Sequence, residues 1–584
     1  MHSGRAMKVW CLPILLAVPR LASAGEAPVT VASEPSSYEK ETLRVAVARL
    51  GAAIDNAPAG KTIEAIEIVS IDPIEERDPL PTALNAVHAT TRRYVLAREV
   101  LVHSGEVWRQ ALVDETARNL RRLPQLSVVL VTALVGSAPD RVRLLVVTKD
   151  VWSLFVDFDF AVSAGGLERL VLKPREINVA GTQTTAFARF VLEPATWALG
   201  AGFIVPRFEG RRLALSGDLN AILNRSSGSL EGTHGTLAVT RPLFSTQTSW
   251  AWLTGVTWRD EIARRYTNAR VAEVIPGVPW MYRLQQFSQQ AAATKSFGWR
   301  FKRDVTFGAE ITHRAYRAFD DALTPFLPRG ERRVGPYAEV REYSTDFLRV
   351  IDLDTLGLQE DVILGHEVSL RVYPVTTALG SSRTFLGVRA GAQYTLPLGD
   401  GYVRASVVSI TESERSRLAD ASLEASLRIA SPRFRIGRLI FDATVLDRYR
   451  NHLRTFSLLG GEGRLRGYPT RALMGSDLVA MNLELRTRSF DLASVQTGGV
   501  LFYDLGDAFE GFSNLRPKHA IGAGLRFVLP QIDRSVIRFD VAFPMTAGVG
   551  AVSTFVSFEH AFTARNIAPP AASTSPLIGG ALGY

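Results

Sequence analysis

The chain has 584 residues, of which 46% are hydrophobic, and its mean hydropathy is +0.07. Beyond residue 24 it contains no apolar run of 18 residues. A helical membrane protein is therefore excluded, because a spanning helix needs about 20 apolar residues. The formal charge of +9 falls to +6 without Arg5, Lys8 and Arg20. The remaining positive charges form no basic patch, which argues against a nucleic-acid partner.

The first 24 residues are predicted to be an export signal. A basic start at Arg5 and Lys8 precedes a short apolar stretch, Val9 to Val18, and a small-residue cleavage site follows at Ala22-Ser23-Ala24. Cleavage there removes Cys11, the only cysteine. The mature chain would then have no disulfide and no thiol chemistry, which excludes a disulfide-stapled scaffold.

Two segments precede the long β-rich part of the chain. Residues 25–60 are rich in Ala, Pro, Ser and Glu and are predicted to be a linker, with a possible short helix at Lys40 to Ala53. Residues 61–150 are predicted to form a small domain of mixed helix and strand. Its expected elements are a strand at 63–68, a helical pair at 81–87 and 92–100, a helix with Leu112, Thr116, Leu120 and Leu123 on one side, and strands at 127–135 and 141–147.

From Trp152 the pattern changes to strands without helices. Apolar and polar residues alternate with a period of two, as in Val479 to Arg486 and Ile537 to Phe543. A soluble sandwich of this size with charged inward faces would lack a core, whereas a barrel with a wet lumen accommodates them. Residues 151–562 are therefore predicted to form an all-β transmembrane barrel. At about 25 residues per strand, the segment from Trp152 to Phe562 gives about 16 antiparallel strands.

The last segment and one internal loop complete the organisation. Residues 563–584 are rich in Pro, Ala and Ser and are predicted to be a flexible tail. The loop 460–469 holds Leu465, Arg466, Gly467 and Tyr468 between glycines. Glycine permits a tight turn, and the permanently charged arginine presents a planar fork suited to a carboxylate. Alone, such a triplet is more often an ordinary exposed turn.

In this context the chain resembles the BamA/TamA-type outer-membrane insertase superfamily, in which POTRA (polypeptide-transport-associated) domains precede a bacterial surface antigen barrel. The segment 61–150 resembles one POTRA domain. Four barrel segments are similar to family elements in the same order: Glu176–Thr182, Leu465–Tyr468, Gly499–Asp507 and Ser553–Phe562.

The resemblance implies an inward-folded loop in which Arg466 pairs with Asp504, or alternatively with Asp540. That both partners are solvated and independent stays an open alternative. The resemblance also implies a protein of the outer membrane, with its N-terminal domain in the periplasm and without cofactor or metal. Its expected partners are the lipid bilayer, unfolded client outer-membrane or secreted proteins, and periplasmic accessory proteins.

By this interpretation, the barrel inserts client strands at a weak seam. Each unpaired backbone amide of a client costs several kcal/mol in hydrocarbon. The seam would join the strand around Phe155–Phe160 to the strand ending at Phe562, and a strand edge opened there would pair these amides. One alternative is a two-partner secretion transporter, whose relatives typically carry two periplasmic domains and an N-terminal plug helix. Another is a passive channel or surface antigen without assembly activity.

An enzyme is not expected. The mature sequence has no H-E-x-x-H metal motif, no G-x-S-x-G elbow and no phosphate-binding glycine loop. An outer-membrane lipase with a dispersed Ser-His pair is the remaining enzymatic alternative, since such a site needs no local signature.

Overall fold

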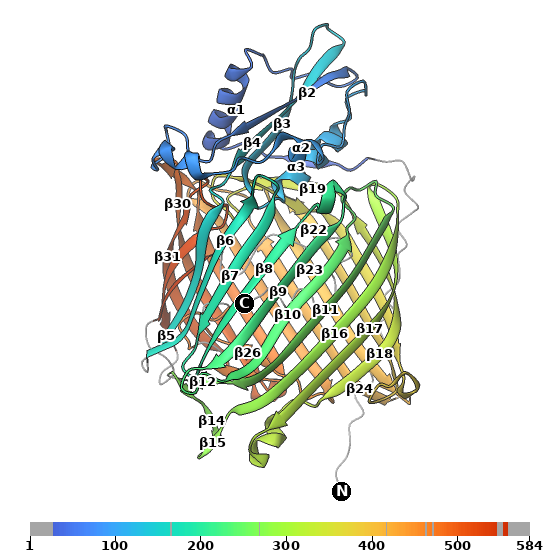
Figure 1. The fold of residues 1–584 in the computed structure, drawn as a ribbon, viewed down its shortest axis with the longest axis vertical. Coiled ribbons are helices and arrows are strands. Elements are labelled where there is room, and N and C mark those ends of the chain that lie inside the picture. Colours follow the sequence, from blue (N-terminus) through green and yellow to red (C-terminus); the bar gives the residue numbers. More distant parts are fainter. Residues whose placement is uncertain are drawn as a thin grey trace.

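The computed structural model describes residues 27–163, 166–267, 269–415, 417–461, 464–469, 472–545 and 553–558. The expected signal 1–24, Phe562 and the expected tail lie outside these residues. Figure 1 shows a small domain of helices and strands seated on one end of a wide barrel of tilted strands. We call that end of the barrel the domain end and the opposite one the far end.

A three-stranded mixed sheet forms the centre of the small domain. Strand β4 pairs in parallel with β2 and antiparallel with β3. The predicted order of strand, helices, strand and strand is present, and Trp108 shares a core with Leu112 and Leu120. The elements up to the barrel are β1 (Thr30–Ala32), α1 (Ser37–Arg49), β2 (Thr62–Ile71), η1 (Thr82–Val87), α2 (Arg93–Ala97), α3 (Gln110–Arg121), β3 (Leu126–Val135) and β4 (Arg141–Asp150).

The segment before β2 contains the short helix that the sequence allowed at Lys40 to Ala53, shifted to Ser37–Arg49, but the rest of the segment is not a free linker. Helix α1 begins after Ser36, which forms a capping box with Glu39. Its buried face carries Tyr38, Thr42 and Ala46, spaced four residues apart, and packs on the sheet. This stripe is narrow and partly polar, so the charged outer face of the helix dominates the composition. Strand β1 is also ordered and pairs with β19 of the barrel part.

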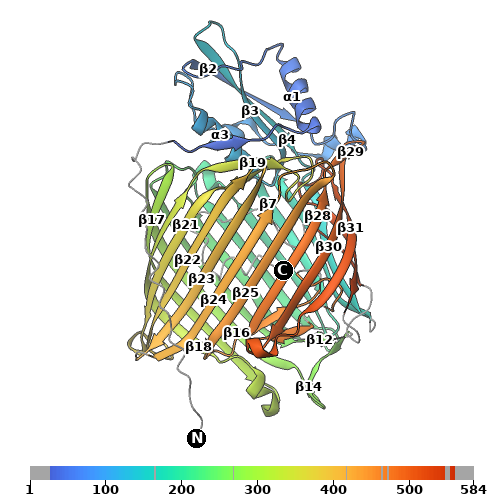
Figure 2. The ribbon, with the colours of Figure 1, turned by 180° about the vertical axis from the view of Figure 1, so that it is seen from behind.

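The barrel is one closed antiparallel sheet whose strands follow chain order (Figure 2). Among the described residues it has twenty wall positions, because β28 and β29 lie end to end along β30. The sheet closes where β33 neighbours β5. Its strands are β5 (Leu154–Ser163), β6 (Gly166–Val179), β7 (Thr184–Leu192), β8 (Thr196–Val205), β9 (Ala214–Asn224), β10 (Leu230–Arg241), β11 (Trp250–Arg264), β16 (Met281–Phe297), β17 (Phe301–Ala318), β18 (Glu331–Ser344), β21 (Gly365–Val375), β22 (Phe385–Leu398), β23 (Gly401–Glu414), β24 (Arg417–Ala430), β25 (Gly437–Asn451), β28 (Asp477–Thr487), β29 (Phe490–Leu492), β30 (Val495–Phe509), β31 (Lys518–Val528), β32 (Ile537–Pro544) and β33 (Ser553–Phe558).

The expected number of about 16 strands is therefore too low. It assumed about 25 residues for each strand with its loop. Several turns at the domain end are much shorter than that allowance: Gly399 and Asp400 alone join β22 to β23, and residues 180–183 join β6 to β7. Because these turns are short, more of the segment is available for strands, and the barrel has more strands than expected.

Side chains of the wall alternate between a charged lumen and an apolar outside. On β32, Arg538 and Asp540 are 3% and 1% exposed, whereas the intervening Phe539 and the following Phe543 are 42% and 46% exposed. This arrangement reverses that of a soluble protein and matches a barrel with a lipid-facing surface. The predicted period of two is confirmed. No helix in the described part of the chain is long and apolar enough to span a bilayer.

A hairpin from the barrel lies across the domain end. Strands β19 (Phe347–Ile351) and β20 (Gln359–Ile363) form it within the connection between β18 and β21. Its apolar residues pack on Tyr402, Ala430 and Ile440 of β23 to β25. Farther around the mouth, Arg486 of β28 donates a hydrogen bond to Leu353 O (2.5 Å), and Thr355 donates one to Arg534 O (2.7 Å). The hairpin thus crosses from β18 to the loop between β31 and β32.

The small domain covers the hairpin and the rest of the mouth. Arg121 of α3 forms a bidentate pair with Asp361 of β20 at 2.8 and 3.0 Å. On the other side of the barrel, Glu99 pairs with Arg207 of the β8–β9 loop at 2.5 Å. The helix α1, the hairpin and the β31–β32 loop also share one apolar core. Together these contacts fix the domain over the lumen.

Shorter elements fill the loops. At the far end they are β12 (Tyr266–Thr267), β13 (Arg270–Val271), β14 (Glu273–Ile275), β15 (Val278–Pro279), η3 (Asp321–Phe326), η4 (Thr377–Leu379), β26 (Ser457–Leu459), β27 (Leu473–Gly475) and η5 (Phe512–Asn514), and at the domain end η2 (Phe208–Gly210).

Candidate functional site: a buried arginine in the barrel lumen

The glycine-rich loop folds into the lumen from the far end, between β25 and β28. The side chains of Leu465 and Tyr468 are fully buried, and the Tyr468 hydroxyl donates a hydrogen bond to His519 O at 2.8 Å. Gly467 has a φ of +89°, and a Cβ there would lie 3.2 Å from Pro544 N. Both the backbone conformation and the close wall require glycine at this position.

Arg466 lies at the centre of a set of carboxylates. Its Nε and Nη2 each donate to Asp504 at 2.8 Å, and its backbone N–H donates to the same carboxylate at 3.1 Å. Glu484 lies 2.8 Å from the same Nη2, and Asp540 lies 3.3 Å from Nη1. All four side chains are fully buried. The guanidinium carbon sits 3.5 Å from the centre of the Phe502 ring.

Further charges complete this cluster on the same wall. Arg486 pairs with Glu484 at 2.8 Å, and Arg526 pairs with Asp540 at 2.5 Å. Asp504 accepts a further hydrogen bond from Asn482 at 2.8 Å. Within the described part of the chain, Arg466 is therefore the only arginine paired with Asp504, whereas the other two acids each have a second one.

The structure brings together Arg466 and both of its predicted partners, Asp504 and the alternative Asp540. Sequence reasoning missed Glu484 and Phe502. Both lie on the inward faces of β28 and β30, opposite each other in register. Phe502 has room because Gly522 faces it, where a Cβ would come within 2.2 Å of the ring. The inward parity of the strands was visible in the sequence, but the register and the path of the loop were not.

The first family-like segment, Glu176–Thr182, has a different location. It joins the barrel to the domain: Asn178 donates hydrogen bonds to Ala89 O at 2.9 Å and to Thr91 Oγ1 at 3.0 Å. At Gly181, a Cβ would lie 2.5 Å from Thr90 O. This segment therefore forms part of the joint.

Polar contacts tie the seam between the first and last strands at the domain end. The Trp152 N–H donates to Gln531 O at 2.6 Å. Arg175 of β6 pairs with Asp157 of β5 at 2.8 Å and with Asp533 beyond the seam at 3.3 Å. Among the described residues, this backbone hydrogen bond and the shared Arg175 hold the foot of the seam, meaning its domain end.

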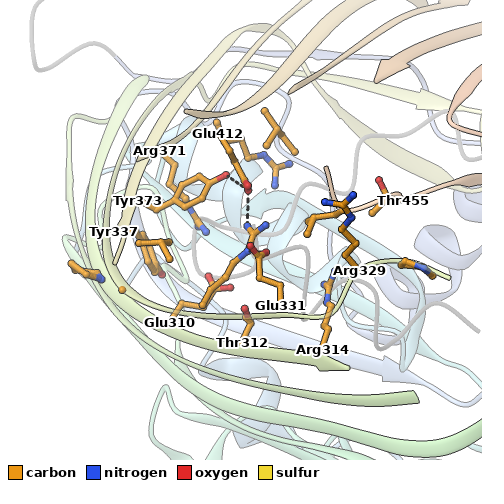
Figure 3. Close-up of a pocket in the computed structure, with 18 of the residues that line it drawn as sticks. Glu310, Thr312, Arg314, Arg329, Glu331, Tyr337, Arg371, Tyr373, Glu412 and Thr455 are labelled. Carbon is orange, nitrogen blue, oxygen red and sulfur yellow. Dashed lines mark hydrogen bonds and ion pairs between the residues drawn. The ribbon is translucent and has the colours of Figure 1, made fainter. Parts of the chain in front are cut away.

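A second polar cluster lines a lumen cavity of about 310 Å³ on the wall formed by β17 to β23 (Figure 3). Arg333 and Arg383 each bridge Glu331 and Glu412. The Tyr373 hydroxyl donates to Glu412 at 3.4 Å. These pairs brace the wall. Among the described residues, no cluster of three or more His, Cys, Asp or Glu is placed to hold a metal ion.

No protein-family model matches the chain, and no curated protein matches its sequence. The solved structures similar to it include the following three. BamA from Haemophilus ducreyi lacking POTRA domains 1–3 has 12% identity and a TM-score of 0.34, with 85% of this chain and 83% of that chain covered. CdiB from Escherichia coli has 13% identity and a TM-score of 0.41, with 93% and 92% covered. The alcaligin outer-membrane receptor FauA from Bordetella pertussis has 13% identity and a TM-score of 0.35, with 73% and 75% covered.

Proposed function

We propose that the protein is an outer-membrane barrel that helps client polypeptides enter the bilayer as β-strands at the seam between β5 and β33. The small domain, as a POTRA-like domain, would face the periplasm, and the far end the outside. An extended client in hydrocarbon leaves backbone amides unpaired at several kcal/mol each. A strand edge opened at the seam would pair them by β-augmentation, without a cofactor.

The observation that carries this proposal is the double cover on the domain end. A route through the lumen would have to displace both the β19–β20 hairpin and the domain. These are held by an apolar core and by buried pairs such as Arg121 with Asp361. Helix α1, the candidate plug helix of the sequence, packs on the domain sheet and does not fill the lumen. Both features favour insertion at the seam over two-partner secretion through the lumen.

The seam offers a route that does not pass through this cover. Its foot depends on the Trp152–Gln531 hydrogen bond and on Arg175. Gln531 in turn donates to Asp78 of the small domain at 2.6 Å. A client or accessory protein that shifts the domain would therefore act directly on the foot of the seam.

A reversible lock tests the proposal. Cysteines replacing Trp152 and Gln531 would join the seam, in a mature chain expected to contain no other cysteine. The oxidised protein should lose the ability to promote folding of a client barrel into liposomes, and a reductant should restore it. The matched control pair is Ala443 and Met481, which face each other between β25 and β28, away from the seam. Equal client folding with the seam locked and unlocked would refute the proposal.

A further inference from the structure

The N-terminal strand of the chain lies on the edge of the hairpin that covers the lumen. We call residues 29–33 the strap. Phe347 N–H donates to Val29 O at 2.9 Å, and Ser33 N–H donates to Arg349 O at 3.1 Å. The side chains of Val29 and Val31 are 46% and 49% exposed. The strap is therefore held through its backbone, in a short parallel pairing, and buries little apolar surface.

One strap side chain meets a buried cation. Thr30 Oγ1 accepts a hydrogen bond from Arg118 Nη1 at 2.9 Å. Arg118 is 2% exposed and lies 4.0 Å over the Phe347 ring. Its Nη2 has no hydrogen-bond partner among the described residues. The Thr30 hydroxyl thus accepts a hydrogen bond from only one Nη of the Arg118 guanidinium, whose planar geometry suits the two oxygens of a carboxylate.

The acids around Arg118 have other partners, and Glu115 accepts hydrogen bonds from the backbone N–H and the hydroxyl of Thr246. Asp361 is bound by Arg121, and Asp114 lies 3.3 Å from Arg349. Burial lowers the pKa of Arg118 to about 10, so it remains a cation at neutral pH. Ser33 Oγ of the strap is also buried without a hydrogen-bond partner in the described structure. The strap therefore fits its site imperfectly at two positions.

We propose that the edge of β19 is a docking site for an extended polypeptide carrying an Asp or Glu, and that the strap occupies this site in the resting protein. A carboxylate in the place of the Thr30 hydroxyl would accept hydrogen bonds from both Nη atoms of Arg118. The backbone of the incoming segment would take over the hydrogen bonds of the strap. The nature of this partner, an extended client, rests on the proposed function. The site would hold the client at the mouth, between domain and barrel.

Peptide binding to the purified full barrel in detergent tests this proposal. The probes are labelled peptides of residues 27–33 that carry Thr30→Asp or, as a neutral isostere, Thr30→Asn. A variant lacking its own residues 27–33 should bind the Asp peptide at least tenfold more tightly than the Asn peptide. The intact chain should bind both peptides more weakly, because the strap competes. The further change Arg118→Gln should remove the difference between the peptides.

Equal affinity for the two peptides, or binding that is indifferent to strap deletion, would overturn the proposal and place the peptide on another edge. A second measurement does not need the Arg118 variant to fold. In the otherwise unchanged protein, Thr30→Asp should slow hydrogen exchange at the Phe347 amide relative to Thr30→Asn, and equal exchange would also overturn it. Neither measurement involves client insertion. A failed seam lock with intact peptide selectivity would therefore refute only the proposed function.

Discussion

Replacing Arg466 by alanine should destabilise the barrel by an amount set by the carboxylate that is left alone. Glu484 keeps Arg486, and Asp540 keeps Arg526. Asp504 loses its only arginine partner and keeps the hydrogen bonds from Asn482 and from the backbone N–H of residue 466. Removing one partner of a buried ion pair costs about 3–5 kcal/mol. We therefore expect Arg466→Ala to lower the free energy of unfolding by about 4 kcal/mol.

Changes at Asp504 should cost less, because the arginine keeps other partners. In Asp504→Ala the guanidinium still lies 2.8 Å from Glu484 and 3.3 Å from Asp540. We expect Asp504→Ala to lower the free energy of unfolding by about 1–3 kcal/mol, which is typical of a hydrogen bond to a charged group. The double variant should be no less stable than Arg466→Ala, since the stranded carboxylate is gone. Arg466→Lys should recover little, because an ammonium cannot reproduce the bidentate contact.

The assay is denaturant unfolding in detergent micelles, followed by tryptophan fluorescence and by the heat-dependent shift in SDS mobility. The matched control is Arg464→Ala in the same loop. Arg464 is 29% exposed, and its partner Asp442 keeps an ion pair with Arg428. A partly exposed pair contributes about 1 kcal/mol or less. Equal losses for Arg464→Ala and Arg466→Ala, or additive losses in the Arg466/Asp504 double variant, would refute the reasoning.

Three further changes probe the loop, the cover and the seam. Gly467→Ala should cost about 1–3 kcal/mol through strain at its positive φ and expose the loop to protease, whereas an unchanged digestion pattern would contradict this. Burial raises the pKa of Asp361, but Arg121 and Arg349 lower it further, so it lies well below its ordinary value. The contribution of this carboxylate to the docking of the small domain on the barrel is therefore present above about pH 4 and is lost as the pH falls below that value. Hydrogen exchange of α3 should rise at low pH and lose this dependence in Asp361→Asn. Arg175→Ala should lower the temperature of the SDS mobility shift by loosening the seam foot, and an unchanged temperature would contradict this role.

The sequence predicted the wall of the barrel well because the face that a strand residue occupies is a local property. The alternation at Ile537 to Phe543 reappears as buried charge and exposed phenylalanine. The number of strands was not predictable in the same way, since it depends on turns as short as Gly399 and Asp400. The helix at Ser37–Arg49 was placed a few residues late, because its buried stripe is mostly small or polar.

The residues of the candidate site also differ in whether a local sequence signal could reveal them. The loop motif and the resemblance led to Arg466 and Asp504, which lie 38 positions apart. Glu484 was missed because its role depends on where the loop ends within the lumen. The contact of Thr30 with Arg118 was out of reach altogether, because an ordinary threonine and a helical arginine 88 positions apart carry no shared signal. Long-range contacts of this kind follow from the docking of the domain.

The partners of Arg466 lie on β28, β30 and β32, so the loop braces the last strands of the wall up to the neighbour of the seam strand β33. With β32 held, opening at β33 would disturb only the seam itself. We therefore expect Arg466→Ala to impair client folding in liposomes even under conditions where the barrel stays folded. The matched variant is Arg371→Ala, which breaks a lumen pair with Glu339 at 2.6 Å on β21 and β18, about halfway around the barrel from the seam. If both variants reduced client folding equally at equal stability, the brace would have no specific relation to the seam.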